Sequence, residues 1–251
     1  MPTATCPSEK RVVVLLSTMR AGSTLLKALL AEADDVSNLP EINFQQFRSR
    51  HRACQQIAAL HHNRIIVLKR PAWYHEVWSY PRLPALDAIK AIILVRDVYE
   101  TVVSLRQMTF GKLTTLLNPL VNSYLVQYWA RVTERLSNLY EQLGDNAYCV
   151  RYEDLVQKPL ETTRALFAFI GSRRQAGVAR YRQPGTFQWQ WGRDDGGQKI
   201  RSLRVQPSAF HDYKDPALLT AILRSRRVQR LRAHLAYPAL PGASTRAVWH
   251  A

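Results

Sequence analysis

Residues 12–30 read VVVLLSTMRAGSTLLKALL, and this stretch decides the fold. Residues 12–16 form a short apolar run dominated by valine, which is typical of a strand buried on both faces of a parallel sheet. Residues 17–24 (STMRAGST) are mostly small or polar, and the leucines that follow recur at helical spacing. The stretch therefore predicts a strand, a tight turn and a helix, in that order.

The same pattern returns along the chain. Apolar runs that predict buried strands occur at residues 65–68 (IIVL), 91–95 (AIILV) and, more weakly, 147–151 (AYCVR). Helical patterns occupy about 99–108, about 119–143, about 159–170 and a basic stretch at about 216–236. Because strands alternate with helices, the sequence predicts an α/β fold with a parallel sheet flanked by helices. We expect one domain over residues 1–251, with its core at about 10–236 and a tail at 237–251.

The charge of the chain is unusual. Thirty-five Lys and Arg against 19 Asp and Glu give a net charge of +16 over 251 residues. From residue 173 onward, fifteen Lys and Arg face four Asp, a net +11. Such a field attracts nucleic acid, an anionic membrane or a multiply phosphorylated cofactor, and a solvated arginine-rich surface explains it equally well. Charge alone does not choose among these.

The sequence carries no sign of export or of a disulfide framework. No apolar run approaches the roughly 20 residues that span a bilayer, and the first residues lack the basic and apolar regions of a signal peptide. Cys6, Cys54 and Cys149 are too few and too scattered for a disulfide framework or a metal cluster. We therefore expect reduced thiols, a cytoplasmic location, no membrane span and no metal.

The turn at residues 17–24 has the features of an anion site. Gly22 allows close backbone approach, Ser23 and Thr24 supply hydroxyls at a helix start, and Arg20 adds a cation suited to phosphate-type oxygens. An ordinary capped helix after a strand is the alternative. The turn is not a Walker A loop, because its first glycine and the lysine before Ser23 are missing, which counts against an ATPase or kinase.

Residues 17–26, S-x-x-R-A-G-S-T-L-L, resemble the 5′-phosphosulfate loop of sulfotransferases that use phosphoadenosine phosphosulfate (PAPS), particularly the tyrosylprotein-type and bacterial small-molecule branches. The resemblance implies a P-loop-NTPase-like three-layer sandwich. It also implies PAPS as the donor and adenosine 3′,5′-bisphosphate as the product. The same resemblance implies that the 5′ end of the nucleotide and the sulfuryl group are bound by Arg20, Ala21, Gly22, Ser23 and Thr24.

A second motif fits the other end of such a nucleotide. Residues 92–104 (IILVRDVYETVVS) resemble the family's 3′-phosphate motif LVRDPxxxxxS, with Val98 in place of proline, and this assigns Arg96 and Ser104. A salt bridge at the strand end is the alternative. RYEDL at 151–155 resembles a segment of the family whose tyrosine lies near the nucleotide, which implies that Tyr152 contacts the cofactor. An aromatic residue of the core is the alternative. WGRDDGGQKIR at 191–201 resembles a late basic loop, with Lys199 or Arg201 as its cation.

Sulfuryl transfer to a hydroxyl needs a base, and Glu41 is the candidate. It lies 21 residues after Arg20 in NLPEINF. This spacing resembles the one between the loop arginine and the catalytic glutamate of tyrosylprotein-type sulfotransferases. A surface glutamate is the alternative. Leu39, Ile42 and Phe44 give it apolar neighbours in the sequence. Lys69, after the second strand, matches a lysine that steadies the sulfuryl oxygens, or is a solvated lysine. His75 and His211 are alternative bases, although each fits a structural role better.

The predicted function is transfer of a sulfuryl group from PAPS to a hydroxyl of a small-molecule acceptor. Aromatic residues at 73–80 and 187–191 form either an acceptor pocket or core. The rivals are a basic nucleic-acid-binding protein, supported by the +11 region, and a P-loop-like nucleotide kinase. We expect no specific nucleic-acid partner. The oligomeric state stays open, with a homodimer as one option.

Overall fold

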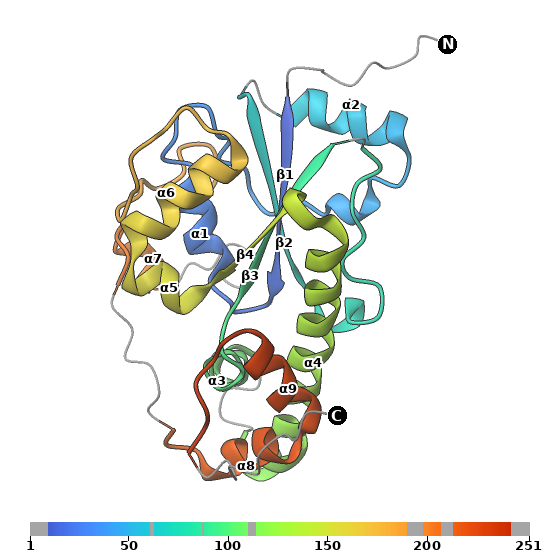
Figure 1. The fold of residues 1–251 in the computed structure, drawn as a ribbon, viewed down its shortest axis with the longest axis vertical. Helices are drawn as coiled ribbons and strands as arrows, with labels where there is room; N and C mark the ends of the chain where they lie inside the picture. The colour runs from blue at the N-terminus through green and yellow to red at the C-terminus, as the bar shows by residue number, and fades with distance from the viewer. Residues whose placement is uncertain are drawn as a thin grey trace. The chain divides into compact units, whose positions relative to one another are not determined.

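The computed structural model describes residues 10–60, 63–86, 88–109, 114–189, 198–206 and 213–241 (Figure 1). Its centre is a sheet with strand order β2-β1-β3-β4, in which every pairing is parallel. The strands are β1 (Arg11–Thr18), β2 (Ile65–Ala72), β3 (Ile89–Val95) and β4 (Ala147–Arg151). The four strands predicted from apolar runs are therefore confirmed.

Helices connect and follow the strands. They are α1 (Ser23–Leu30), α2 (Arg50–Leu60), α3 (Val98–Thr109), α4 (Thr114–Leu143), α5 (Tyr152–Gln157), α6 (Pro159–Ile170), α7 (Gln198–Arg201), α8 (Pro216–Arg224) and α9 (Arg226–His234), with short 3-10 turns η1 (Phe44–Gln46), η2 (Tyr74–Glu76) and η4 (Gly144–Asn146). The helix predicted at 216–236 is in fact two. Ser225 interrupts it with an extended backbone, and its side chain accepts the N–H of Val228 as the cap of α9.

Both faces of the sheet are buried, as a parallel sheet requires. On one face, Val13 and Leu15 of β1 belong to a core that includes Leu26 of α1 and Phe167 of α6. The opposite face of β1 is equally buried. Figure 1 shows α1, α5 and α6 on one side of the sheet, and α2 with residues 132–143 of α4 on the other. The three-layer α/β fold expected from the sequence is confirmed.

The strand order places a switch point beside β1. The connection after β1 leads to β2 on one side, whereas the connection after β3 leads to β4 on the other, so the switch point lies between the carboxyl ends of β1 and β3. Open parallel sheets bind ligands in the crevice at such a point. Ser17 of β1 pairs with Leu94 of β3, so the segments after these strands, which contain Arg20 and Arg96, start next to each other.

The contacts divide the described chain into two compact units. The first comprises residues up to Arg96 together with 132–210, and it contains the sheet; the second comprises residues 97–131 and those from 211 onward. Within the second, Arg106 binds Asp215 at 2.6 Å, and the Asp215 N–H donates to the Tyr99 hydroxyl at 2.8 Å. The single domain expected from the sequence stays a prediction.

One expectation about the cysteines is wrong. Cys149 is a free thiol, and burial raises its pKa to about 11. Cys54, buried in α2, is disulfide-bonded rather than reduced. Spacing along the sequence does not reveal which thiols meet in space, so the reduced state was inferred from number and scatter alone. The cytoplasmic location stays a prediction.

Candidate active site

The loop between β1 and α1 has the shape of an anion cradle. Arg20 and Gly22 both have left-handed backbones, with φ of 62° and 96°. These two positions turn the chain so that α1 starts at Ser23, with Gly22 as its N-cap. The first N–H groups of a helix have no partner within the helix, and its dipole favours negative charge there. The loop can therefore hold a phosphate-type group.

Tyr152 and Arg96 pack against this loop. A Cβ built on Gly22 would lie only 2.4 Å from Cδ2 of the Tyr152 ring, so the loop backbone rests directly on that ring. The Arg96 guanidinium lies 4.5 Å from the centre of the same ring, and its Nη1 donates to the Arg20 carbonyl at 3.0 Å. The structure thus brings together four residues, Arg20, Gly22, Arg96 and Tyr152, that the sequence assigned to three separate motifs.

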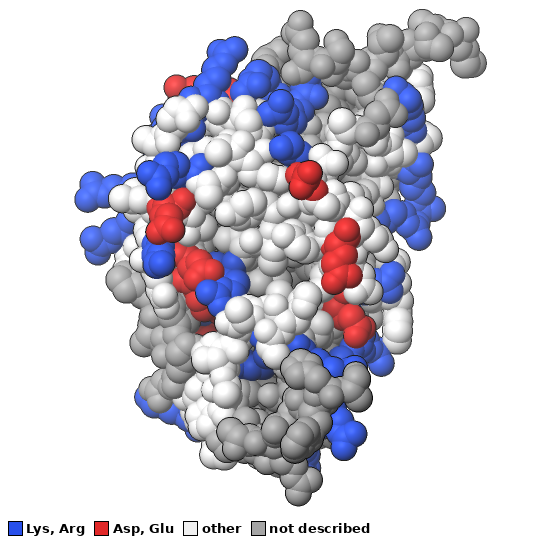
Figure 2. All heavy atoms as spheres, in the orientation of Figure 1, with Lys and Arg blue, Asp and Glu red and all other residues white. Residues whose placement is uncertain are grey.

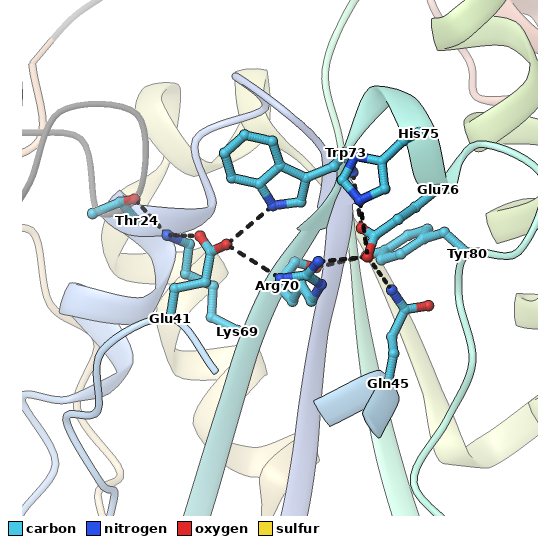
Figure 3. Close-up of polar contacts among 9 residues, drawn as sticks. All are labelled: Thr24, Glu41, Gln45, Lys69, Arg70, Trp73, His75, Glu76 and Tyr80. Atoms are coloured by element: carbon cyan, nitrogen blue, oxygen red, sulfur yellow. Dashed lines mark hydrogen bonds and ion pairs between the residues drawn. The ribbon is translucent and has the colours of Figure 1, made fainter. Parts of the chain in front are cut away.

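A second cluster adjoins the loop through Lys69, which lies within β2 rather than after it. The Lys69 ammonium donates to the Thr24 hydroxyl at 3.0 Å and lies 3.3 Å from Oε2 of Glu41. The side chains of Lys69 and Glu41 are only 1% and 8% exposed, which excludes the solvated lysine and the surface glutamate considered above. Figure 3 shows the line of contacts from Thr24 through Lys69 to Glu41.

The surroundings of Glu41 are more polar than its sequence neighbours suggested. Arg70 lies 3.9 Å from its Oε1, and the indole N–H of Trp73 donates to the same oxygen at 3.4 Å. Together with Lys69, these groups favour the ionised carboxylate. An ionised carboxylate next to an anion loop is what a base for a hydroxyl proton requires.

Sequence analysis missed the residues that hold this cluster from the side of β2. Arg70 Nη2 binds Oε1 of Glu76 at 2.5 Å, and Gln45 donates to the same oxygen at 2.9 Å. Their one signal in the sequence was the position of Arg70 next to Lys69, at the end of a predicted strand. Nothing local in the sequence pairs Arg70 with a carboxylate six residues later.

Tyr80 ties the ends of β1 and β2 together. Its hydroxyl accepts the N–H of Ser17 at 3.0 Å and donates to the Arg70 carbonyl at 2.8 Å. Complete burial raises the pKa of Tyr80 well above its usual range, so the phenol stays protonated. Within the run of aromatics at 73–80, Tyr80 is therefore core, whereas Trp78 is 66% exposed. In the second run, Trp189 is core and packs edge-on against Tyr181.

Several assigned residues lie away from these contacts. Lys199 and Arg201 are exposed on α7, while most of the loop that precedes them is outside the described residues. Ser104 lies on α3, in the second unit. His75 is 77% exposed, with Nε2 3.9 Å from Glu76, and His211 is outside the described residues.

Asp97 of the second motif has a structural role. It forms a buried ion pair with Arg232 of α9, and its Oδ1 accepts the N–H of Tyr99 at the start of α3. The strand-end salt bridge that the sequence left open therefore exists, but its cation is Arg232, in the C-terminal part of the chain. The Arg96 guanidinium instead contacts the loop and Tyr152.

A depression of the described surface lies elsewhere. It measures about 700 Å³ and is lined by Ala33, Asp34, Asp35, Asn63, Arg64, Arg173 and Arg174. Asn63 and Arg64 precede β2, so this depression belongs to the amino edge of the sheet, opposite the loop. An aromatic acceptor pocket stays a prediction.

Solved structures show what this arrangement is similar to. The sulfotransferase domain from the curacin biosynthetic pathway is 23% identical with a TM-score of 0.60, covering 92% of this chain and 99% of that one. The sulfotransferase domain from the Synechococcus PCC 7002 olefin synthase is 19% identical, with a TM-score of 0.56 and coverages of 94% and 98%. Mouse sulfotransferase SULT7A1, complexed with PAP, is 13% identical, with a TM-score of 0.56 and coverages of 92% and 91%. The chain has the sulfotransferase fold.

The sequence comparison agrees over part of the chain. Residues 83–175 match the sulfotransferase family, and this segment contains Arg96, Ser104 and Tyr152. No curated protein sequence matches the chain. The resemblance to the sulfotransferase family is therefore confirmed. The loop at 17–24, Glu41 and Lys69 lie outside the matched segment, so their roles depend on the geometry above.

Two features are absent from the residues that the structure describes. None of the helices there combines the length and apolar character needed to cross a bilayer. In the same residues, no three His, Cys, Asp or Glu side chains come together as metal ligands would.

Proposed function

We propose that this chain is an enzyme that transfers a sulfuryl group from PAPS to a hydroxyl of a small-molecule acceptor. One observation carries the proposal: the loop at 17–24 joins two clusters. Arg96 and Tyr152 contact it at Arg20 and Gly22, and Lys69 contacts it at Thr24 while also binding the carboxylate of Glu41. Groups for a phosphorylated nucleotide and a base are thus joined through one loop.

The residues around the loop fit a doubly phosphorylated donor. The buried hydroxyls of Ser17 and Thr18, at the end of β1, have no hydrogen-bond partner within the described chain, which leaves donors for a ligand at the head of the loop. Residues 20–24 would hold the 5′ end, and Arg96 with Ser104 the 3′-phosphate. Tyr152 would lie near the nucleotide, and Lys199 or Arg201 would close over it.

The chemistry divides among the protein's own groups. When bound, PAPS supplies the activated sulfuryl group. Glu41 would accept the proton of the acceptor hydroxyl, and the Lys69 and Arg70 cations near its carboxylate support this role because they favour the ionised form. Lys69 and Arg20 would offset the negative charge that grows on the leaving phosphate, and Lys69 also keeps the base beside the loop.

The rival functions leave these contacts unexplained. A nucleotide kinase would need a lysine before Ser23, whereas the cation that reaches the loop hydroxyl is Lys69 from β2. A nucleic-acid-binding protein would use a continuous basic face. Figure 2 shows Lys and Arg at several separate places on the face drawn, with Asp and Glu among them.

Ligand-induced thermal stabilisation tests the proposal. Adenosine 3′,5′-bisphosphate at 100 times its Kd should add about 2.7 kcal/mol of stability. This corresponds to a rise of roughly 5–10 °C in Tm for a chain of this size. We expect the rise without magnesium, and we expect smaller rises with ATP–Mg and with a single-stranded oligonucleotide.

Turnover with sulfur-labelled PAPS and a panel of phenols, sterols, sugars and aliphatic alcohols then identifies the acceptor. Transfer of label to any hydroxyl supports the proposal. Larger stabilisation by oligonucleotide than by the bisphosphate would instead favour the nucleic-acid-binding protein, and stabilisation that requires ATP and magnesium would favour the kinase.

A further inference from the structure

Arg70 lies between two buried carboxylates. Its Nη1 is 3.9 Å from Glu41 Oε1, and its Nη2 is 2.5 Å from Glu76 Oε1. The three side chains are only 8–11% exposed. Figure 3 shows Arg70 with Glu41 on one side and Glu76 on the other. At such burial, charges interact much more strongly than on an open surface.

Glu76 is itself fixed from several directions. Gln45 donates to its Oε1 at 2.9 Å, and the backbone N–H of Trp73 donates to its Oε2 at 3.2 Å. The backbone of Arg70 is held as well, because its carbonyl accepts the Tyr80 hydroxyl. Glu76 therefore has a fixed position from which it holds the Arg70 guanidinium.

The charges of the cluster balance. Lys69 and Arg70 carry two positive charges, and Glu41 and Glu76 carry two negative ones. Lys69 also donates a hydrogen bond to Thr24 of the loop, whereas Arg70 interacts with both carboxylates. His75, whose Nε2 lies 3.9 Å from Glu76, is a further titratable contact of that carboxylate and is largely solvated. The buried phenol of Tyr80 stays neutral.

We propose that Arg70 and Glu76 are positioning residues that set the orientation and the basicity of Glu41. The inference rests on the proposed function in one respect, the role of Glu41 as the base. Without Glu76, the charge of Arg70 would act on Glu41 alone and make it a weaker base. Without Arg70, Glu41 would lose one cation and feel the unbalanced charge of Glu76, so it would bind a proton more readily.

The test is a titration of the Glu41 carboxyl by 13C NMR, in protein with labelled glutamate side chains and no ligand. The Glu41 signal is assigned by its loss in Glu41→Gln. We expect Glu76→Gln to lower the midpoint of Glu41 by roughly one pH unit and Arg70→Gln to raise it by roughly as much. Two shifts in opposite directions distinguish charge tuning from a general loosening of the site.

Controls make the outcome decisive. Glu141→Gln and Arg230→Gln remove the same charges from exposed positions and should leave the midpoint unchanged. Arg70→Lys keeps the charge and should stay within about 0.3 pH unit of the wild type. If Glu76→Gln does not fold, the comparison of Arg70→Gln with Arg70→Lys decides. A Glu41 midpoint that rises in Arg70→Gln but not in Arg70→Lys then supports the inference. Equal midpoints in Arg70→Gln and Arg70→Lys, or shifts of one sign in Arg70→Gln and Glu76→Gln, overturn it.

Turnover gives a second readout. Because Glu76 is expected to act through Glu41, Glu76→Gln should lower kcat roughly tenfold and leave the KM for PAPS unchanged. An unchanged kcat would overturn the inference. Wild-type protein that neither binds the bisphosphate nor turns over PAPS would refute the proposed function instead, and the titration would still judge the coupling of the three side chains.

Discussion

Gly22 combines two constraints that a side chain would violate together. Its backbone is left-handed, with φ of 96°, and a Cβ there would lie 2.4 Å and 2.6 Å from two carbons of the Tyr152 ring. Gly22→Ala should therefore displace the ring or the loop, at a cost of about 1–3 kcal/mol. Because the loop is the proposed anion site, we expect affinity for the bisphosphate, measured by calorimetry, to fall at least about tenfold.

Gly144 offers a matched control for this change. It also has a left-handed backbone, with φ of 51°, but no atom lies within 4 Å of a Cβ built on it. Gly144→Ala therefore carries a backbone cost without a collision, and it should leave bisphosphate affinity intact. Equal affinities in the two variants would show that the contact with Tyr152 does not shape the loop.

Glu41 is the residue on which the proposed chemistry depends most. Glu41→Gln keeps the size of the side chain and removes its ability to take a proton, so turnover should fall about 10²–10⁴-fold. Bisphosphate affinity should change by less than about twofold, because the carboxylate contacts Lys69 and not the loop itself. Glu141→Gln, at an exposed position, is the control. Near-normal turnover would transfer the role to His75 or His211.

Helix α3 is joined to α9 by a pair of buried charges. Asp97 and Arg232 are 1% and 2% exposed, and Arg232 also donates to the Pro238 carbonyl at 2.6 Å. Burial lowers the pKa of Arg232 to about 10, so it stays charged near neutral pH. The basic C-terminal helix therefore has at least one arginine whose role is internal rather than a contact with a polyanion.

Removing that arginine should destabilise the second unit. Arg232→Met leaves Asp97 buried without its ion-pair partner, at a cost of about 3–5 kcal/mol. We expect a drop of roughly 6–20 °C in Tm, read by circular dichroism. The double variant Asp97→Asn/Arg232→Met should recover a large part of the loss, because no charge then remains buried. Arg230→Met, on the exposed side of α9, should change little; an equal drop there would refute the assignment.

The elements could be predicted where local pattern and burial coincide. The valine- and isoleucine-rich runs predicted β1, β2 and β3 because these strands are largely buried on both faces, whereas the weaker run at 147–151 predicted β4, which is only partly buried. Helix α6 was predicted at about 159–170 and is observed over Pro159–Ile170, because Pro159 and Gly171 mark its ends. The break at Ser225 was missed because apolar residues continue at helical spacing across it, while the cap is a single hydroxyl.

The candidate site could be predicted only in part. Arg20, Gly22, Arg96 and Tyr152 lie in local motifs, and the structure brings them together. Pairs that meet across the chain leave no local signal: Asp97 and Arg232 are 135 residues apart, and Gln45 reaches Glu76 across 31. Such partners are fixed by packing and strand order, which a single sequence does not state.

The net charge of +16 acts on the molecule as a whole, and it separates the proposed function from its non-enzymatic rival. A long-range field binds any polyanion by releasing counterions, so oligonucleotide affinity should fall about 10³-fold between 50 mM and 200 mM salt if six phosphates are neutralised. Bisphosphate binding should fall less than about tenfold, because few charges are involved and its sites are partly buried and therefore less screened.

Fluorescence anisotropy of a labelled oligonucleotide and calorimetry of the bisphosphate, over one salt series, make the comparison. If the positive charge has no specific nucleic-acid partner, we expect the affinities for the oligonucleotide and for the bisphosphate to cross as the salt concentration rises. The bisphosphate should then be bound more tightly at 200 mM salt. A protein built to bind nucleic acid would keep the tighter affinity for the oligonucleotide at that concentration. In that case the arginines after residue 173 would be the functional surface, and the loop at 17–24 an ordinary helix cap.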